Sequence, residues 1–184
     1  MIGVILYGPP AAGKDTITAA LHQLDPAYTH FRRLKAGPGR TTGYRMTTPQ
    51  HLSKLRQRGE VIWENRRYDS AYVVDRSTLV NLLTHAIPVV HLGQVEAITA
   101  VTEAIPDASW ITAYLWCPRD VAEQRIIARN TGDAPARLQA WDETPPLPDA
   151  DLAINTAETS PDAAAQEIHQ RIAKRAQHCR IDPY

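Results

Sequence analysis

The feature that most constrains this chain is a short apolar run followed directly by a glycine-rich loop. Residues 2–7 read IGVILY and predict a buried strand, and residues 15–24 predict a helix. Between them, residues 8–16 read GPPAAGKDT, with the glycine, four residues and Gly-Lys of a phosphate-binding loop. Such a loop turns its backbone N–H groups toward a phosphate at a helix N-terminus, where the helix dipole favours an anion. With its lysine present, the pattern predicts phosphate binding and not a plain turn.

The loop lysine is followed by an unusual residue. Gly13 lets the backbone approach a phosphate closely, and Lys14 brings a point charge to the terminal phosphates. In a standard loop the next residue supplies a hydroxyl to Mg²⁺, but here Asp15 holds that place and Thr16 follows. We expect Thr16 near the phosphates, and Asp15 is either a metal-shell carboxylate or an acid favoured by the helix dipole. The predicted phosphate-binding residues are Gly8, Pro9, Pro10, Ala11, Ala12, Gly13, Lys14, Asp15 and Thr16, with Asp15 and Thr16 on the metal side.

Length and composition limit the class of protein. A chain of 184 residues predicts one domain. Lys plus Arg and Asp plus Glu number 20 each, so no net charge favours nucleic acid or a membrane, and we expect neither as a partner. Cys117 and Cys179 lack metal-ligand spacing and favour a reducing cytoplasm. The sequence predicts neither a signal peptide nor a membrane span.

Positive charge is concentrated in one section of the chain. Residues 31–67 contain ten basic side chains against Glu60 and Glu64. A solvated face accounts for some of them, and a second anion-binding surface explains the clustering better. The basic residues are Arg32, Arg33, Lys35, Arg40, Arg45, Lys54, Arg56, Arg58, Arg66 and Arg67.

Strand and helix patterns alternate along the chain. We expect residues 25–48 to be irregular, with one short strand at 43–47. Thr48 and Pro49 then predict an N-cap and first helical residue, in a helix that ends at Gly59. The alternation implies right-handed crossovers and a parallel sheet. Further strands are predicted at 60–63, 72–74, 87–92, 110–117 and 152–155, and further helices at 76–86, 95–105, 118–129, 135–141 and 161–177.

This order of elements resembles the guanylate kinase-like branch of the nucleoside monophosphate kinases. The resemblance rests on GPPAAGKDT, the basic section, Gly59-Glu60-Val61-Ile62, IPVVHLG and an arginine-bearing helix. It extends to the ribose 1,5-bisphosphate phosphokinases, which often carry Gly-Lys-Asp in the loop. It implies one α/β P-loop kinase domain over 1–184, in three layers with a central parallel sheet. The core would take 1–27, 87–117 and 150–184, an acceptor-binding insertion 28–86, and a helical lid 118–149.

The resemblance also implies the donor side of a site. Kinases of this kind use ATP with Mg²⁺, and their lids carry Arg-x-x-x-Arg and a later arginine. Arg125, Arg129 and Arg137 match that layout, and would clamp the transferring phosphoryl group together with Lys14. Arg119 reads as an ordinary surface residue.

The acceptor side departs from guanylate kinases. Tyr72 alone remains of their Tyr-Tyr-Gly segment, Tyr44 lies close to a matching tyrosine, and Gly93 replaces the acid that would contact guanine. A site that lacks its hydrogen-bonding partners loses orders of magnitude in preference, so guanylate is not expected as the acceptor. The expected acceptor-binding residues are Arg32, Arg33, Lys35, Arg40, Tyr44, Glu64, Tyr72 and Gln94.

The sequence thus predicts an ATP-dependent phosphotransferase acting on a small, phosphorylated, nucleotide-like acceptor. Two alternatives stay open: a sugar-phosphate or antibiotic kinase, and a catalytically inactive guanylate kinase-like binding module. A nucleotide switch or motor is disfavoured, because the strand VVHLG carries His91 where such proteins need a carboxylate.

Overall fold

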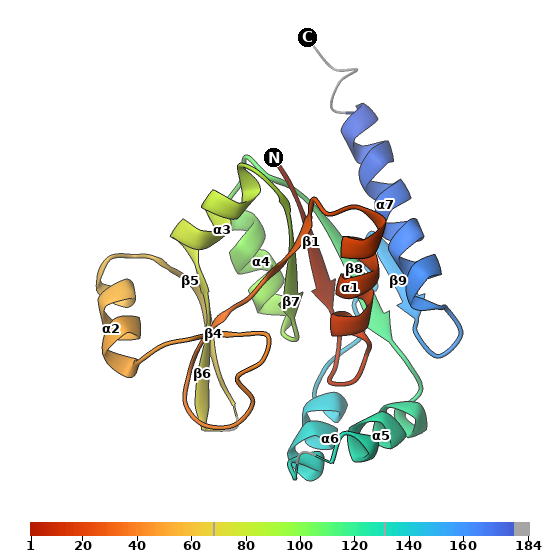
Figure 1. The fold of residues 1–184 in the computed structure, drawn as a ribbon, viewed down its shortest axis with the longest axis horizontal. Helices are drawn as coiled ribbons and strands as arrows, with labels where there is room; N and C mark the ends of the chain where they lie inside the picture. Colours follow the sequence, from red (N-terminus) through yellow and green to blue (C-terminus); the bar gives the residue numbers. More distant parts are fainter. Residues whose placement is uncertain (68, 131, 179–184) are drawn as a thin grey trace.

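A central sheet of five parallel strands, in the order β2-β7-β1-β8-β9, organises the chain (Figure 1). The computed structural model describes residues 1–67, 69–130 and 132–178. In the central sheet, Val4 of β1 pairs with Val89 of β7 on one side and with Ile111 of β8 on the other. The strands are β1 (Ile2–Tyr7), β2 (Tyr28–Phe31), β7 (Ile87–Leu92), β8 (Ser109–Trp116) and β9 (Leu152–Asn155).

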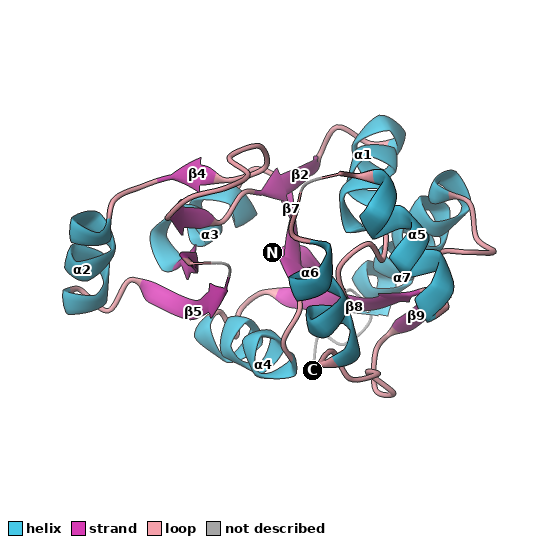
Figure 2. Cartoon of the chain, turned by 90° about the horizontal axis from the view of Figure 1, so that it is seen from below, coloured by secondary structure: helices cyan, strands magenta, loops and turns pink. Residues whose placement is uncertain are grey.

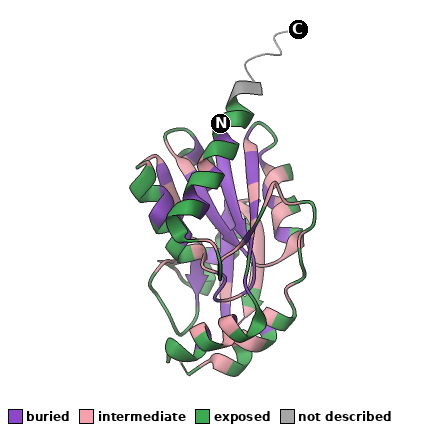
Figure 3. Ribbon diagram, turned by 90° about the vertical axis from the view of Figure 1, so that its right-hand side faces the viewer, coloured by how far each residue is buried: buried purple, intermediate pink, exposed green. Residues whose placement is uncertain are grey.

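Helices cover both faces of this sheet. The four helices are α1 (Lys14–Leu24), α3 (Arg76–Leu83), α4 (Val95–Ala104) and α7 (Pro161–His178). Val4 and Leu6 point into a core shared with α1 and α7, whereas Ile5 points into a core shared with α3 and α4. Because successive side chains of a strand alternate between faces, the continuous apolar run of β1 fills both cores. Figure 3 shows the buried strands between helices with exposed outer faces.

A second sheet, in the order β4-β3-β6-β5, stands beside the first (Figure 2). Its elements are β3 (Leu34–Ala36), β4 (Arg45–Met46), α2 (Pro49–Gln57), β5 (Val61–Arg67) and β6 (Ser70–Asp75). Leu52 and Leu55 of α2 pack on Leu34 and Val73 of the sheet. The helix begins as predicted, since the Thr48 hydroxyl accepts from the backbone N–H of His51 at 3.2 Å.

Two short helices, α5 (Arg119–Ala128) and α6 (Ala134–Asp142), lie near the carboxyl ends of the core strands, within the segment 118–149 that was predicted as a lid (Figure 1). The Tyr7 hydroxyl, at the end of β1, donates to the Pro145 carbonyl at 2.8 Å. This bond ties the end of the lid segment to the core sheet. None of the described helices is both long and apolar enough to cross a bilayer.

The predicted α/β fold with a central parallel sheet is confirmed, and the short strand expected within 43–47 is present as β4, but the expectation that the rest of 25–48 is irregular is wrong. That stretch holds β2 and β3, and β2 pairs with β7 at the edge of the core sheet. The core sheet therefore extends past residue 27 into the section predicted as an insertion. Tyr28 and Phe31 are buried against the core, while the two residues between them are half-buried. Cys117 is a buried free thiol, and Cys179 lies outside the described residues.

Candidate active site

The glycine-rich loop joins β1 to α1 in a conformation that its glycines permit. Gly8 and Gly13 have φ of 150° and 90°, and Gly13 is the N-cap of α1. A Cβ at Gly8 would lie 2.1 Å from the backbone oxygen of Leu115 on β8, so no larger residue fits there. The loop can therefore pass close to β8 and present its backbone N–H groups at the start of α1.

Lys14 lies folded against this loop. Its ammonium donates to the backbone oxygens of Gly8 at 2.6 Å and Pro9 at 2.8 Å. Burial is the largest of the effects that lower the pKa of Lys14 to about 7, and the nearby charges of Arg33 and Arg129 contribute to the same shift. An anion beside Lys14 would oppose both effects, so the geometry suits a phosphate.

Asp15 and Thr16 differ in where they point. Asp15 lines the cleft, where its Oδ2 lies 3.3 Å from both terminal nitrogens of Arg40. Its Oδ1 lies 3.6 Å from Nδ1 of His91. Thr16 is exposed and is not among the residues that line the cleft. Of the two residues predicted on the metal side, Asp15 is the one with an oxygen facing the cleft.

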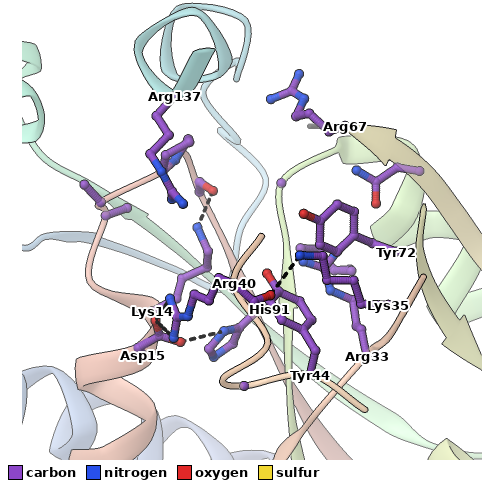
Figure 4. A pocket seen from close by; sticks show the side chains of 18 of the residues that line it. Lys14, Asp15, Arg33, Lys35, Arg40, Tyr44, Arg67, Tyr72, His91 and Arg137 are labelled. Carbon is purple, nitrogen blue, oxygen red and sulfur yellow. Dashed lines mark hydrogen bonds and ion pairs between the residues drawn. The ribbon is translucent and has the colours of Figure 1, made fainter. Parts of the chain in front are cut away.

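A cleft of about 580 Å³ runs from the phosphate loop to the second sheet and the lid (Figure 4). Its walls are strongly cationic, because the acidic side chains among its described lining residues are Asp15 and Asp133. In Figure 4, Arg137 points from the lid into the cleft, and Tyr44 and Tyr72 lie on the side of the second sheet. The basic lining residues other than histidine are Lys14, Arg33, Lys35, Arg40, Arg67, Arg129 and Arg137.

The predicted acceptor residues on the second sheet form one aromatic and cationic wall. The rings of Tyr44 and Tyr72 lie 5.3 Å apart, and the Arg33 guanidinium lies 5.5 Å from the centre of Tyr72. Lys35 is almost fully buried and donates to the backbone oxygens of Pro38 at 2.5 Å and Arg40 at 2.8 Å. Burial lowers the pKa of Lys35. Lys35 thus holds the loop that carries Arg40, besides adding charge to the cleft.

The lid arginines do not act alike. Arg137 lines the cleft and bonds Asp133 at 2.7 Å, and Arg129 lines it from the end of α5. Arg125 points elsewhere: its Nη1 donates to the Ala11 backbone oxygen at 3.2 Å, and its Nη2 donates to that of Thr156 at 2.8 Å.

Several residues predicted at the site lie off the cleft. Arg32 is exposed, and its backbone oxygen accepts from Arg45. Glu64 faces away and bonds Arg56 at 2.8 Å, and these bonds hold the pKa of Glu64 below its usual range. Residues at adjacent positions of a strand face opposite sides, so Asn65 lines the cleft where Glu64 cannot. The predicted residues absent from the cleft lining are Pro9, Thr16, Arg32, Glu64 and Arg125.

The cleft also includes residues not predicted at the site. His30 and His91 stack at 4.3 Å between ring centres, and burial lowers the pKa of both. Asn65 and Arg67 reach the cleft from alternate positions of β5. The buried side-chain oxygens of Asn65 and the predicted Gln94 have no hydrogen-bond partner among the described residues. Asn65 and Arg67 lie on the part of β5 beyond the strand predicted at 60–63, and His30 lies on the unpredicted strand β2.

The described residues fit a nucleotide-bound Mg²⁺ better than a metal held by protein alone. Among them, no three His, Cys, Asp or Glu side chains gather as a metal cage. Mg²⁺ in kinase sites needs one or two carboxylates besides the substrate phosphates. Asp15, next to Lys14 and facing the cleft, provides such an oxygen.

No family model matches the sequence. Among solved structures, the chain is similar to a guanylate kinase from Anaplasma phagocytophilum, with a TM-score of 0.64 and 12% identity over 95% of this chain and 85% of that one. It is also similar to a gluconokinase from Sinorhizobium meliloti 1021, with a TM-score of 0.58 and 16% identity over 99% and 97% of the two chains. These likenesses are in fold, and the fold is that of the guanylate kinase-like P-loop kinases.

Proposed function

We propose that the protein is an ATP-dependent phosphotransferase that moves the γ-phosphoryl group of ATP to a small, phosphorylated, nucleotide-like acceptor other than GMP. One observation carries the proposal. A single cleft joins the phosphate loop to two further groups of cations, one on the second sheet and one on the lid. A nucleotide-binding switch needs one phosphate site, whereas a kinase for a phosphorylated acceptor needs two with cationic groups between them.

On the donor side, the loop amides and Lys14 would hold the terminal phosphates of ATP. Bound Mg²⁺ would neutralise charge on the β- and γ-phosphate oxygens. Arg129 and Arg137 face the same space from the lid and would stabilise the charge that develops on the transferring group. Most of the rate enhancement would come from positioning and charge neutralisation.

On the acceptor side, Arg33 and Arg40 would bind the acceptor phosphate, with Tyr44 and Tyr72 beside it. An acceptor that is already a phosphate ester needs no general base, which agrees with the position of Glu64 outside the cleft. Gly93 offers no carboxylate to a guanine edge. The amides of Asn65 and Gln94 both donate and accept, which suits a different base.

The test is ADP release with GMP, AMP, CMP, UMP, dTMP and ribose bisphosphate in parallel. We expect turnover with a nucleotide other than GMP. Arg129→Ala and Arg137→Ala should lower kcat and kcat/KM together, while Arg119→Ala, a surface control, should change neither. Efficient turnover of GMP alone would contradict the acceptor assignment.

A sugar phosphate is the second candidate acceptor. Amide side chains and arginines recognise hydroxyls and phosphates as well as base edges, and Asn65 and Gln94 both carry an unsatisfied oxygen. Turnover of ribose bisphosphate in the same screen would favour this candidate.

A further inference from the structure

We propose that the carboxylate that orients the metal in this protein lies on the phosphate loop rather than on a core strand, and that it is Asp15, positioned by His91. The inference rests on the proposed kinase function and specifies its metal side. In phosphate-loop enzymes, a hydroxyl after the loop lysine and an acid on a core strand share the metal. Here the first position holds Asp15, and His91 stands on β7 in place of a strand carboxylate.

The two residues meet although they lie on different elements. Oδ1 of Asp15, in the first turn of α1, is 3.6 Å from Nδ1 of His91 on β7. The Asp15 side chain is 48% exposed, whereas that of His91 is 11% exposed. The carboxylate therefore faces the cleft with the imidazole behind it. Because Mg²⁺ prefers oxygen to ring nitrogen, Asp15 is the residue suited to the metal.

His91 is fixed on its remaining sides. Its Nε2 lies 2.7 Å from the hydroxyl of Thr18, one turn further along α1. Its ring stacks on His30 from β2 at 28° between planes. We assign the Thr18 hydroxyl as the donor to Nε2, and this assignment places the ring proton on Nδ1, the nitrogen nearer the Asp15 carboxylate. We therefore assign His91 a positioning role, through the carboxylate it orients.

Arg40 occupies the other oxygen of Asp15. Both of its terminal nitrogens lie 3.3 Å from Oδ2, and both side chains are more than one-third exposed. Exposed pairs of this kind are weak, so a divalent cation competes readily with Arg40 for this oxygen. When Asp15 serves the metal, Arg40 becomes available to the acceptor phosphate. This exchange would link donor and acceptor binding.

The experiment measures binding of a non-hydrolysable ATP analogue by calorimetry, with Mg²⁺ and with EDTA in its place. Electron paramagnetic resonance with Mn²⁺ reports metal binding directly. We expect Asp15→Asn to remove about tenfold or more of the metal-dependent gain in affinity. In EDTA, Asp15→Asn should bind the ATP analogue at least as tightly as the wild type does, because the substitution removes a negative charge from the phosphate site. The matched control is Asp107→Asn, an exposed acid outside the cleft lining.

Variants of His91 separate positioning from folding. His91→Asn keeps a donor near the Nδ1 position and should retain most of the metal-dependent gain, whereas His91→Leu should lose it while circular dichroism stays native. The double variant Asp15→Ser with His91→Asp puts a hydroxyl after the loop lysine and a carboxylate on the core strand, as in other phosphate-loop enzymes. It should recover the metal-dependent gain in affinity for the ATP analogue.

The proposal is overturned if Asp15→Asn keeps the full metal-dependent gain, or if Thr16→Val loses it and Asp15→Asn does not. A wild-type protein that fails to bind the ATP analogue would instead contradict the proposed function.

Discussion

The ammonium of Lys14 lies against the backbone oxygens of Gly8 and Pro9, and its side chain is half-buried at the edge of the cleft. Burial brings its pKa from 10.5 to about 7. Between these two values the folded protein binds fewer protons at Lys14 than the unfolded chain does. The contribution of Lys14 to stability therefore rises with pH through this window, and is least favourable below about pH 7.

Phosphate binding should reverse this shift, because an adjacent anion favours the charged lysine. We expect ATP binding at about pH 8 to take up close to one proton, and affinity to weaken as the pH rises above about 7. Calorimetry in buffers of different ionisation enthalpy measures the uptake. The Lys14→Ala variant should bind ATP without taking up this proton, and it should release no ADP. Tight binding by the wild type with no proton uptake would mean that Lys14 is already charged in the free protein.

At the level of elements, α5 is anchored to the phosphate loop through one side chain. Arg125 donates to the backbone oxygens of Ala11 and Thr156 and to the Thr156 hydroxyl. The spacing of Arg125 and Arg129 predicted a shared helix face, and therefore a shared role. Four residues of helix separate the two side chains by about 6 Å along the axis, which is enough to put one on the loop and the other on the cleft.

Loss of the Arg125 hydrogen bonds should weaken the attachment of α5 to the glycine-rich loop and lower the stability of the protein. We expect Arg125→Ala to destabilise the protein by about 1–3 kcal/mol, because backbone oxygens lose charged donors. Arg125→Lys should recover little, since a lysine cannot reproduce the fork of a guanidinium. Urea unfolding and hydrogen exchange of α5 measure the effect. Arg119→Ala on the same helix is the control and should leave stability nearly unchanged, because Arg119 pairs with Asp142 and Glu123 at the surface.

What the sequence could predict depended on how local each feature is. The strand-loop-helix of residues 2–24 was predictable, because its apolar run, glycines and lysine are contiguous. The strands β2 and β3 were not, since four and three residues carry little periodicity and become strands through pairing with β7 and β6. At the site, the register of β5 placed Asn65 in the cleft and Glu64 outside it, and a single sequence does not reveal the bulge between Val61 and Trp63 that sets this register.

In the whole molecule, an ion pair links the second sheet to the lid across the cleft. Arg67 of β5 lies 2.6 Å from Glu143, which follows α6. Their side chains are 31% and 49% exposed, so the pair is weak and open to competition by salt. Arg67 also lines the cleft, where a bound phosphate would attract it. The pair can thus hold the two walls together without preventing their separation.

Removal of the Arg67–Glu143 ion pair should make it less favourable for the lid and the second sheet to close over a bound acceptor. We expect Glu143→Gln to raise the acceptor KM by about twofold to fivefold, the effect of an exposed pair worth up to about 1 kcal/mol. Added salt should raise the wild-type KM in the same way, with a smaller effect on the variant, because its bridge is already absent. The matched control is Asp142→Asn on α6, which breaks a pair within the lid and leaves the bridge intact. Equal salt dependence of KM in the wild type and Glu143→Gln would show that the pair has no part in closure.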